Sequence, residues 1–155
     1  MIKDNKGKKD FFLTRVVFWA LFVSFSAAVP AYAGEIVVIV NKGNKTSNLS
    51  MQDLQQIYQG GKKSWEGGES ITLFLPPAKG EAMKALASKV FSMGDASGVS
   101  KFYLKAVFQQ KFSSPPKSTD NSVAEVSATP GGIAIIDTAE AGDTGPVKVI
   151  KVGGL

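Results

Sequence analysis

Short apolar runs alternate with amphipathic segments along residues 34–155 of the chain. The runs 35–40, 71–75 and 133–136 are nearly unbroken and rich in β-branched residues, which is typical of strands covered on both faces. A fourth run, 147–152, carries lysines among its valines and predicts a strand that lies partly at an edge. Because these strands alternate with helical segments, the pattern predicts an α/β fold whose sheet carries helices on its faces.

The segments between the runs place apolar residues at helical spacing. The first helix is expected to start at Ser50, where Asp53 completes an imperfect capping box, and to end at Gly60-Gly61. Two longer helices are predicted over about 79–93 and 98–112, and a short one follows the capping residues of 118–122. The positions expected to face the core are Met51, Leu54, Ile57, Tyr58, Met83, Leu86, Ala87, Val90, Phe91, Val99, Phe102, Tyr103, Ala106, Val107, Val123 and Val126.

Three further segments each allow two interpretations. Trp65 is expected to fold back on the first helix as core, with Lys62-Lys63 in a solvated turn, while the alternative makes this segment a rim that faces an anion. Phe108 and Phe112 are expected to join Phe102 and Tyr103 in the core and a packing face. The alternatives are an exposed Phe112–Tyr103 patch for a partner and, for the predicted turn at 129–132, a ligand contact.

The N-terminal third has a different composition. Residues 1–15 hold five Lys or Arg and two Asp, residues 16–29 are apolar and uncharged, and Ala31 and Ala33 precede Gly34. This order is typical of a secretory signal peptide, and the apolar run is shorter than the roughly 20 residues that span a bilayer. We therefore expect a signal peptide over 1–33, a domain over 34–155 and a periplasmic or secreted protein, with an uncleaved anchor as the alternative.

Composition limits the chemistry of the mature chain. Cleavage after Ala33 leaves 122 residues, enough for one core, and their 13 lysines against 11 acidic residues give a net charge of +2. This small charge does not favour nucleic acid. The chain has no cysteine and no histidine, which excludes a lipid-anchored lipoprotein, a Ser-His-Asp triad and an imidazole metal site. We expect no enzyme, no cofactor and no metal, and anions would meet only lysines, hydroxyls and backbone N–H groups.

Two motifs occur in one order along the chain. The first joins Leu54 and the tetrapeptide Ile57–Gly60 to Trp65 and Ile71, and the second is Pro130–Ile135. In this order and spacing the chain resembles the phosphate-type periplasmic substrate-binding proteins, above all their short, single-domain members, over about residues 35–137. The resemblance implies an α/β fold made of a single periplasmic-binding-protein-like lobe, with a mixed sheet and helices on both faces.

The resemblance also implies a ligand site. Larger members of the family close two lobes on an oxyanion, which they hold with an N-terminal ligand loop and with an Arg followed by Ser-Gly-Thr at a helix start. Here no such loop precedes the first strand, the Arg position falls near Pro76, and the Ser-Gly-Thr position falls near Gly80-Glu81-Ala82. Lys79, Gly80 and Ala82 are therefore the candidate ligand residues, although Glu81 would place a negative charge there; the alternative for Lys79-Gly80 is an ordinary helix entry.

Thr46 and Ser47 are added from the first strand–helix loop, a place where α/β sheets bind ligands; the alternative there is a plain polar loop. The implied function is weak binding of phosphate or a related oxyanion, for an ABC transporter membrane component or an envelope protein. A homodimer could supply a second wall of the cleft. The alternative function is a ligand-free interaction or sensor module of the cell envelope.

Overall fold

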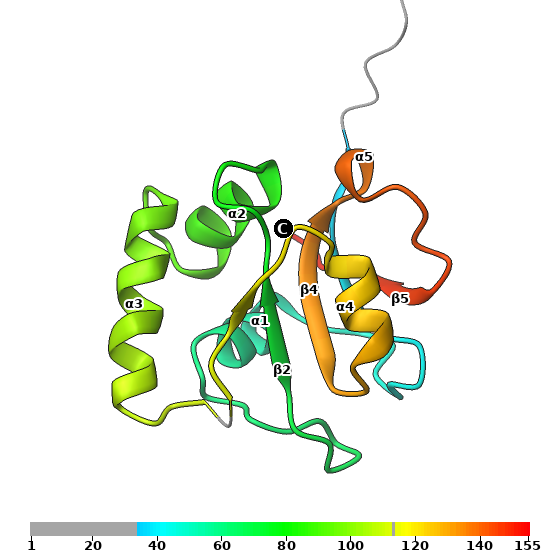
Figure 1. Cartoon of the computed structure of the whole chain (residues 1–155), viewed down its shortest axis with the longest axis horizontal. Coiled ribbons are helices and arrows are strands. Elements are labelled where there is room, and N and C mark those ends of the chain that lie inside the picture. Colours follow the sequence, from blue (N-terminus) through cyan, green and yellow to red (C-terminus); the bar gives the residue numbers. More distant parts are fainter. Residues whose placement is uncertain (1–33, 113) are drawn as a thin grey trace, which may run out of the picture. The chain divides into compact units, whose positions relative to one another are not determined.

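The computed structural model describes residues 34–112 and 114–155, so the predicted signal peptide lies outside the described residues. Within them, five strands form one mixed sheet in the order β3-β2-β4-β1-β5 (Figure 1). The strands are β1 (Ile36–Asn41), β2 (Thr72–Leu75), β3 (Lys117–Ser118), β4 (Gly132–Asp137) and β5 (Val147–Ile150).

The strands of this sheet do not all end on the same side. β2 runs parallel to β3 and β4, whereas β1 runs antiparallel to β4 and β5. The carboxyl ends of β2 and β4 therefore meet at one end of the sheet, and β1 reaches its own carboxyl end at the other.

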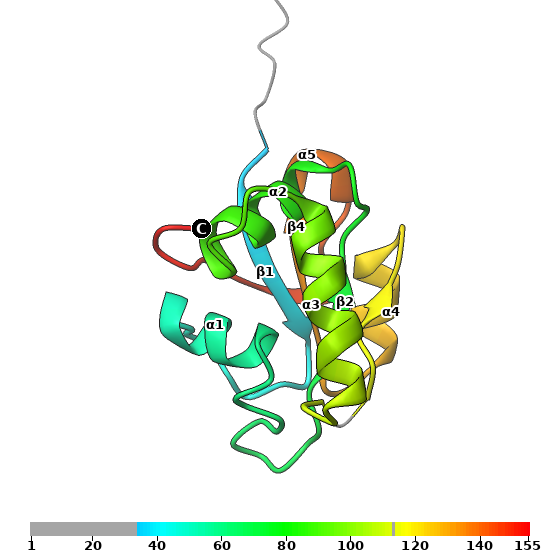
Figure 2. The same ribbon diagram turned by 90° about the vertical axis from the view of Figure 1, so that its left-hand side faces the viewer.

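Helices cover both faces of this sheet (Figure 1 and Figure 2). They are α1 (Met51–Tyr58), α2 (Glu81–Ala85), the π-helical turn η2 (Leu86–Val90), α3 (Ala96–Phe108), α4 (Ser122–Ala128) and α5 (Thr138–Ala141). Val38 and Val40 of β1 pack in the cluster that α1, α2, η2 and α3 build on one face. Val37 and Ile39 pack with α4 on the other, as the two-residue period of a strand requires. The predicted mixed sheet with helices on both faces is confirmed.

The first helix and the tryptophan after it follow the sequence-based expectation. Ser50 and Asp53 form a complete capping box, with both backbone-to-side-chain hydrogen bonds at 3.0 Å. Gly60 has a φ of +82°, a left-handed conformation that ends the helix. Trp65 is 4% exposed, and its Nε1 donates a hydrogen bond of 3.1 Å to the carbonyl of Gly131. Trp65 is therefore a core residue.

Several predicted boundaries are wrong. The helix expected over 79–93 is α2 followed by η2, a wider turn in which the N–H of Phe91 bonds the carbonyl of Leu86 five residues back. It ends at Val90, because Ser92 has a φ of +53°, a left-handed conformation that does not continue a helix. The next helix, α3, begins two residues early at Ala96, capped by Asp95, and ends at Phe108 instead of residue 112. β5 ends at Ile150 rather than at residue 152.

The prediction that Phe108 is a core residue is also wrong. Phe108 is 82% exposed, Leu104 is 65% exposed, and Val107, expected to face inward, is 39% exposed. The reason is the phase of α3, which turns Val99, Tyr103 and Ala106 inward at positions i, i+4 and i+7. The alternative of an exposed Phe112–Tyr103 patch fails as well, because Tyr103 is buried and Phe112 packs against it.

The buried phenols of Tyr58 and Tyr103 make the free energy of unfolding depend on pH in the alkaline range. Burial raises the pKa of both phenols well above the ordinary value, and for Tyr103 the charge of Tyr58 adds to the rise. The unfolded chain releases these protons near pH 10, whereas the folded chain keeps them to higher pH. Stability is therefore complete below about pH 10 and falls as pH rises further.

This dependence can be followed by phenolate absorbance of the chain that starts at Gly34, in which Tyr58 and Tyr103 are the remaining tyrosines. We expect no phenolate until circular dichroism reports unfolding. Phenolate that forms near pH 10 in the folded chain would contradict the burial of both rings.

Candidate functional site

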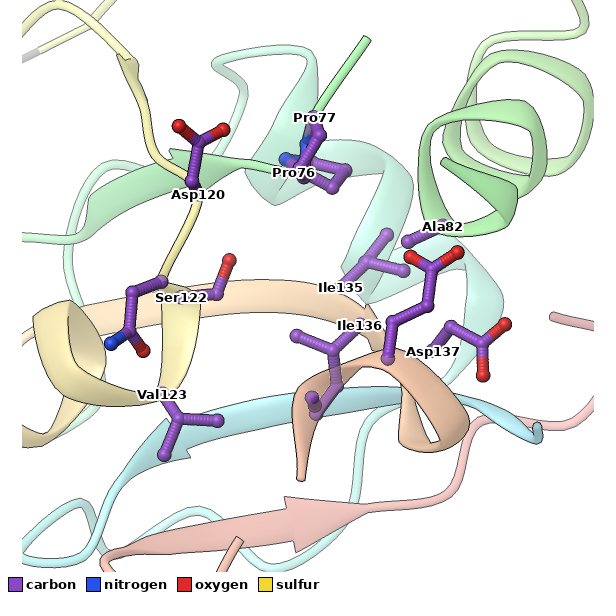
Figure 3. Close-up of a pocket in the computed structure, with 12 residues that line it drawn as sticks. Pro76, Pro77, Ala82, Asp120, Ser122, Val123, Ile135, Ile136 and Asp137 are labelled. Atoms are coloured by element: carbon purple, nitrogen blue, oxygen red, sulfur yellow. The ribbon is translucent and has the colours of Figure 1, made fainter. Parts of the chain in front are cut away.

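A pocket of about 340 Å³ opens at the carboxyl ends of β2 and β4 (Figure 3). This is the end of an α/β sheet at which ligands are usually bound. Residues from both strand ends and from α2, α4 and α5 surround it. They are Pro76, Pro77, Ala82, Asp120, Asn121, Ser122, Val123, Ile135, Ile136, Asp137, Glu140 and Ala141.

Local sequence explains why chain segments end at this pocket. Pro76 and Pro77 follow β2 directly, and because proline lacks an N–H the strand stops there. Asp137 ends β4 and caps α5, since its Oδ1 accepts a hydrogen bond of 2.8 Å from the N–H of Ala139. Asn121 caps α4 in the same way through the N–H of Ala124, at 3.1 Å.

The pocket is acidic. Asp120 and Asp137 lie on opposite sides of it (Figure 3), and Glu140 is the third carboxylate of its lining. No lysine or arginine occurs among the described residues that line it. Asp137 is buried, with 8% of its surface exposed.

Further acidic groups flank the start of α2. The side chain of Glu140 lies next to Gly80, because a Cβ on that glycine would be 3.2 Å from Oε2 of Glu140. Glu81 pairs with Lys84, and the pKa of Lys84 is raised first by this hydrogen bond and to a smaller extent by the charge of Glu140. The residues around this end of α2 therefore oppose a bound anion more than they attract it.

The structure brings together only part of the predicted ligand residues. Lys79 is exposed, Gly80 is the N-cap of α2, and Ala82 lines the acidic pocket, so these three lie at one place. Thr46 and Ser47 follow β1, which runs antiparallel to β4, and therefore lie at the opposite end of the sheet. The five residues do not form one site.

Thr46 lines a second, smaller hollow of about 210 Å³ beside Trp65 and Glu66. Asn44, which also lines it, is 3% exposed, and its side-chain N–H₂ has no hydrogen-bond partner among the described residues. The site of Lys79, Gly80 and Ala82 is separate from this hollow. The three carboxylates of the acidic pocket do not form a metal site, because no group of three or more acidic, histidine or cysteine side chains in the described part of the chain is arranged so that it could hold a metal ion.

A family model described as a PBP superfamily domain matches residues 22–153. The chain belongs to the PBP superfamily. No curated protein matches this PBP superfamily member. Its membership confirms the family resemblance drawn from the order of the Ile57–Gly60 and Pro130–Ile135 motifs.

Solved structures share the fold of this PBP superfamily domain. It is similar to PstS from Borrelia burgdorferi, with a TM-score of 0.54, 14% identity, and coverage of 78% of this chain and 48% of that one. It is also similar to a putative phosphate ABC transporter substrate-binding protein with bound phosphate from Clostridium perfringens. That structure has a TM-score of 0.50 and 18% identity, and the match covers 79% of this chain and 46% of that one. An ABC-type phosphate transport receptor from Vibrio cholerae has a TM-score of 0.50 and 15% identity, and the match covers 79% of this chain and 47% of that one. The chain spans about half the length of these proteins, and such low identities show the fold alone.

Three carboxylates of the PBP superfamily domain were missed by sequence reasoning. Asp137 could have been found, because it directly follows a buried apolar run, where a strand end places its side chain at the ligand edge. Asp120 and Glu140 carried no such signal. Their approach to the pocket depends on how α4 and α5 pack after distant parts of the sheet have paired.

No helix in the described residues of this PBP superfamily domain is long and apolar enough to span a membrane.

Proposed function

We propose that this PBP superfamily domain is an exported, non-enzymatic solute-binding protein that holds phosphate or a related oxyanion weakly and serves an ABC transporter. The observation that carries the proposal is the pocket at the carboxyl ends of β2 and β4, in a fold whose solved relatives include phosphate transport proteins. Export follows from the leader pattern of residues 1–33.

Lys79, Gly80 and Ala82 would form the contact with the oxyanion. Lys79 is exposed on the segment between Pro77 and Ala82, which both line the pocket, and can contribute a mobile positive charge. The N–H groups of the first turn of α2 have no partner within the helix and can donate hydrogen bonds. Gly80 lacks a side chain, so a ligand can approach its backbone next to Ala82, although it would meet the carboxylate of Glu140 there.

Binding is expected to be weak for a physical reason. Glu140 and Glu81 place negative charge beside the proposed contact, and the described lining adds no lysine or arginine to offset it. The anion also stays partly hydrated in an open lobe. We expect a Kd between about 1 mM and tens of micromolar, or roughly −4 to −6 kcal/mol, that rises with added salt.

Isothermal titration of the exported protein with phosphate, sulfate and an alkylammonium salt tests the proposal. Glu140→Gln should strengthen phosphate binding by a factor of about 2 to 5 and Lys79→Ala should weaken it equally, since one solvated charge contributes up to about 1 kcal/mol. Lys45→Ala is the matched control, because Lys45 lines the hollow at the opposite end of the sheet.

Two outcomes of this titration would contradict the oxyanion assignment. If the phosphate affinity is unchanged by Lys79→Ala and Glu140→Gln but lowered by Lys45→Ala, the ligand would lie beside Thr46. Ammonium binding that exceeds phosphate binding and weakens in Glu140→Gln would make the acidic pocket a site for cations.

A second candidate function is an interaction module of the cell envelope. It is favoured by the outer face of α3, where Leu104 and Phe108 are exposed beside Lys101 and Lys105. Residues 96–119 contain four lysines and no acidic residue. An apolar surface rimmed by lysines fits an acidic patch on an envelope protein. No heat signal with any of the three salts would favour this candidate.

The homodimer, in which a second copy of the chain would supply the other wall of the cleft, stays a prediction.

A further inference from the structure

Gly34 lies directly against the carboxylate of Asp137. A Cβ built on Gly34 would be 1.5 Å from Oδ1 of Asp137 and 2.7 Å from the backbone nitrogen of Ala139. Only a residue without a Cβ fits there. The backbone nitrogen of any residue lies about 2.5 Å from the Cβ position. The nitrogen of Gly34 is therefore within about 4 Å of the Asp137 oxygen, whichever way the backbone turns.

Glu35 and Ile36, which follow Gly34, are bonded to the segment that contains Asp137 and Thr138. The N–H of Glu35 donates to Oγ1 of Thr138 at 2.9 Å, and the N–H of Thr138 donates to the carbonyl of Glu35 at 3.1 Å. The carboxylate of Glu35 pairs with Lys151 at 2.9 Å. Ile36 then enters the sheet opposite Asp137. Gly34 is thus joined, through Glu35 and Ile36, to the segment that carries Asp137.

Asp137 has no positively charged partner among the described residues. It is 8% exposed, and its Oδ1 accepts the N–H of Ala139. Among the described residues, the ion pairs are Lys84–Glu81 and Lys151–Glu35, so Asp137 belongs to neither. A buried carboxylate is best accommodated when a cation offsets its charge.

We propose that removal of residues 1–33 creates an α-ammonium on Gly34 that forms an ion pair with Asp137. Hydrolysis by a leader-removing endopeptidase breaks the bond between the carbonyl carbon of Ala33 and the nitrogen of Gly34. Water supplies the oxygen of the new Ala33 carboxylate, and the released amine is protonated at neutral pH. An amide N–H with one donor is thereby replaced by an ammonium with three donors and a charge.

The ion pair would also change the acidic pocket. Asp137 is one of its three carboxylates, so processing would offset one negative charge at the candidate ligand site. The pocket would become less repulsive to an anion only after export. The inference rests on the export part of the proposed function and is independent of which solute binds.

The test uses the full chain, exported and recovered from the periplasm. Intact mass should show a chain that starts at Gly34. An amine-acylating reagent applied near neutral pH, where lysines are protonated, then labels the α-amine, and peptide mass analysis reads the rate. We expect labelling about tenfold slower in the folded protein than in the urea-unfolded protein, because a neighbouring carboxylate that raises the pKa of the ammonium by one unit lowers the free amine tenfold.

Two variants separate the ion pair from general burial. Asp137→Asn keeps an oxygen for the N–H of Ala139 and removes only the charge, so labelling should rise to nearly the unfolded rate. Asp143→Asn is the matched control, because Asp143 is an exposed carboxylate that caps Gly145, and it should leave the slow rate unchanged. The other charged groups of these segments are Glu35 and Lys151, which pair with each other, and Glu140.

The outcomes that overturn the inference are distinct. A full-length chain, or one that starts elsewhere, contradicts the export proposal and the ion pair together. A chain that starts at Gly34 but labels at the unfolded rate, or equally slowly with Asp137→Asn, contradicts the ion pair alone. The comparison of the folded and unfolded parent needs no variant, so labelling of the folded parent at the unfolded rate overturns the ion pair even if Asp137→Asn does not fold.

Discussion

Trp65→Ala should lower the free energy of unfolding by about 3–5 kcal/mol, the usual cost of deleting a large buried aromatic side chain. Trp65 is 4% exposed in the main cluster with Leu54 and Ile57, and its indole N–H bonds the carbonyl of Gly131. The substitution removes the contact between the segment after α1 and the start of β4. Urea unfolding followed by circular dichroism measures the loss.

Trp65→Phe is the matched variant. It keeps an aromatic ring in the cluster but removes the N–H donor, which leaves the carbonyl of Gly131 with only the bond from Thr72. Its stability should lie between those of the parent and Trp65→Ala. An unchanged midpoint for Trp65→Ala would mean that the side chain is exposed, and the interpretation of residues 62–65 as an anion-facing rim would gain support.

Gly131→Ala should cost about 1–3 kcal/mol, the usual cost of forcing an extra methyl group into a packed site. A Cβ on Gly131 would be 1.9 Å from the carbonyl oxygen of Ser70, so the backbone before β2 must move. The carbonyl of Gly131 accepts hydrogen bonds from Thr72 at 3.0 Å and from Trp65 at 3.1 Å. Any shift therefore disturbs the junction of β2 with β4.

Gly67→Ala is the control for this substitution, because no atom lies within 4 Å of a Cβ at Gly67. Its effect should stay within about 0.5 kcal/mol. Equal urea midpoints for Gly131→Ala and the parent would contradict the close approach of Ser70 to Gly131.

Long, strongly patterned elements could be predicted from the sequence. The β-branched run of β1 and the apolar run of β4 are buried on both faces, and such runs leave little choice of environment. β3 and α5, with two and four residues, were not predicted. Their formation depends on the pairing of Lys117 with Phe74 and on the cap at Asp137, which are consequences of tertiary packing rather than of local pattern.

The candidate site could be predicted only in part for the same reason. The choice of Gly80 and Ala82 came from the family resemblance, whose Ser-Gly-Thr position falls on their segment, and the structure places this segment beside a pocket. Thr46 could not be assigned to an end of the sheet, because its place depends on the antiparallel direction of β1. Glu140 approaches Gly80 across some 60 intervening residues, and no local pattern announces that contact.

Amide NMR spectra recorded during a phosphate titration of the exported protein test the central claim most directly. Chemical-shift changes report where an anion binds, and one saturation curve gives its affinity. We expect saturable shifts at Gly80, Glu81 and Ala82, none at Thr46 or Ser47, and a Kd between about 1 mM and tens of micromolar. Shifts that fail to saturate, or that gather at Thr46 and Ser47, would contradict a solute site at the carboxyl ends of β2 and β4.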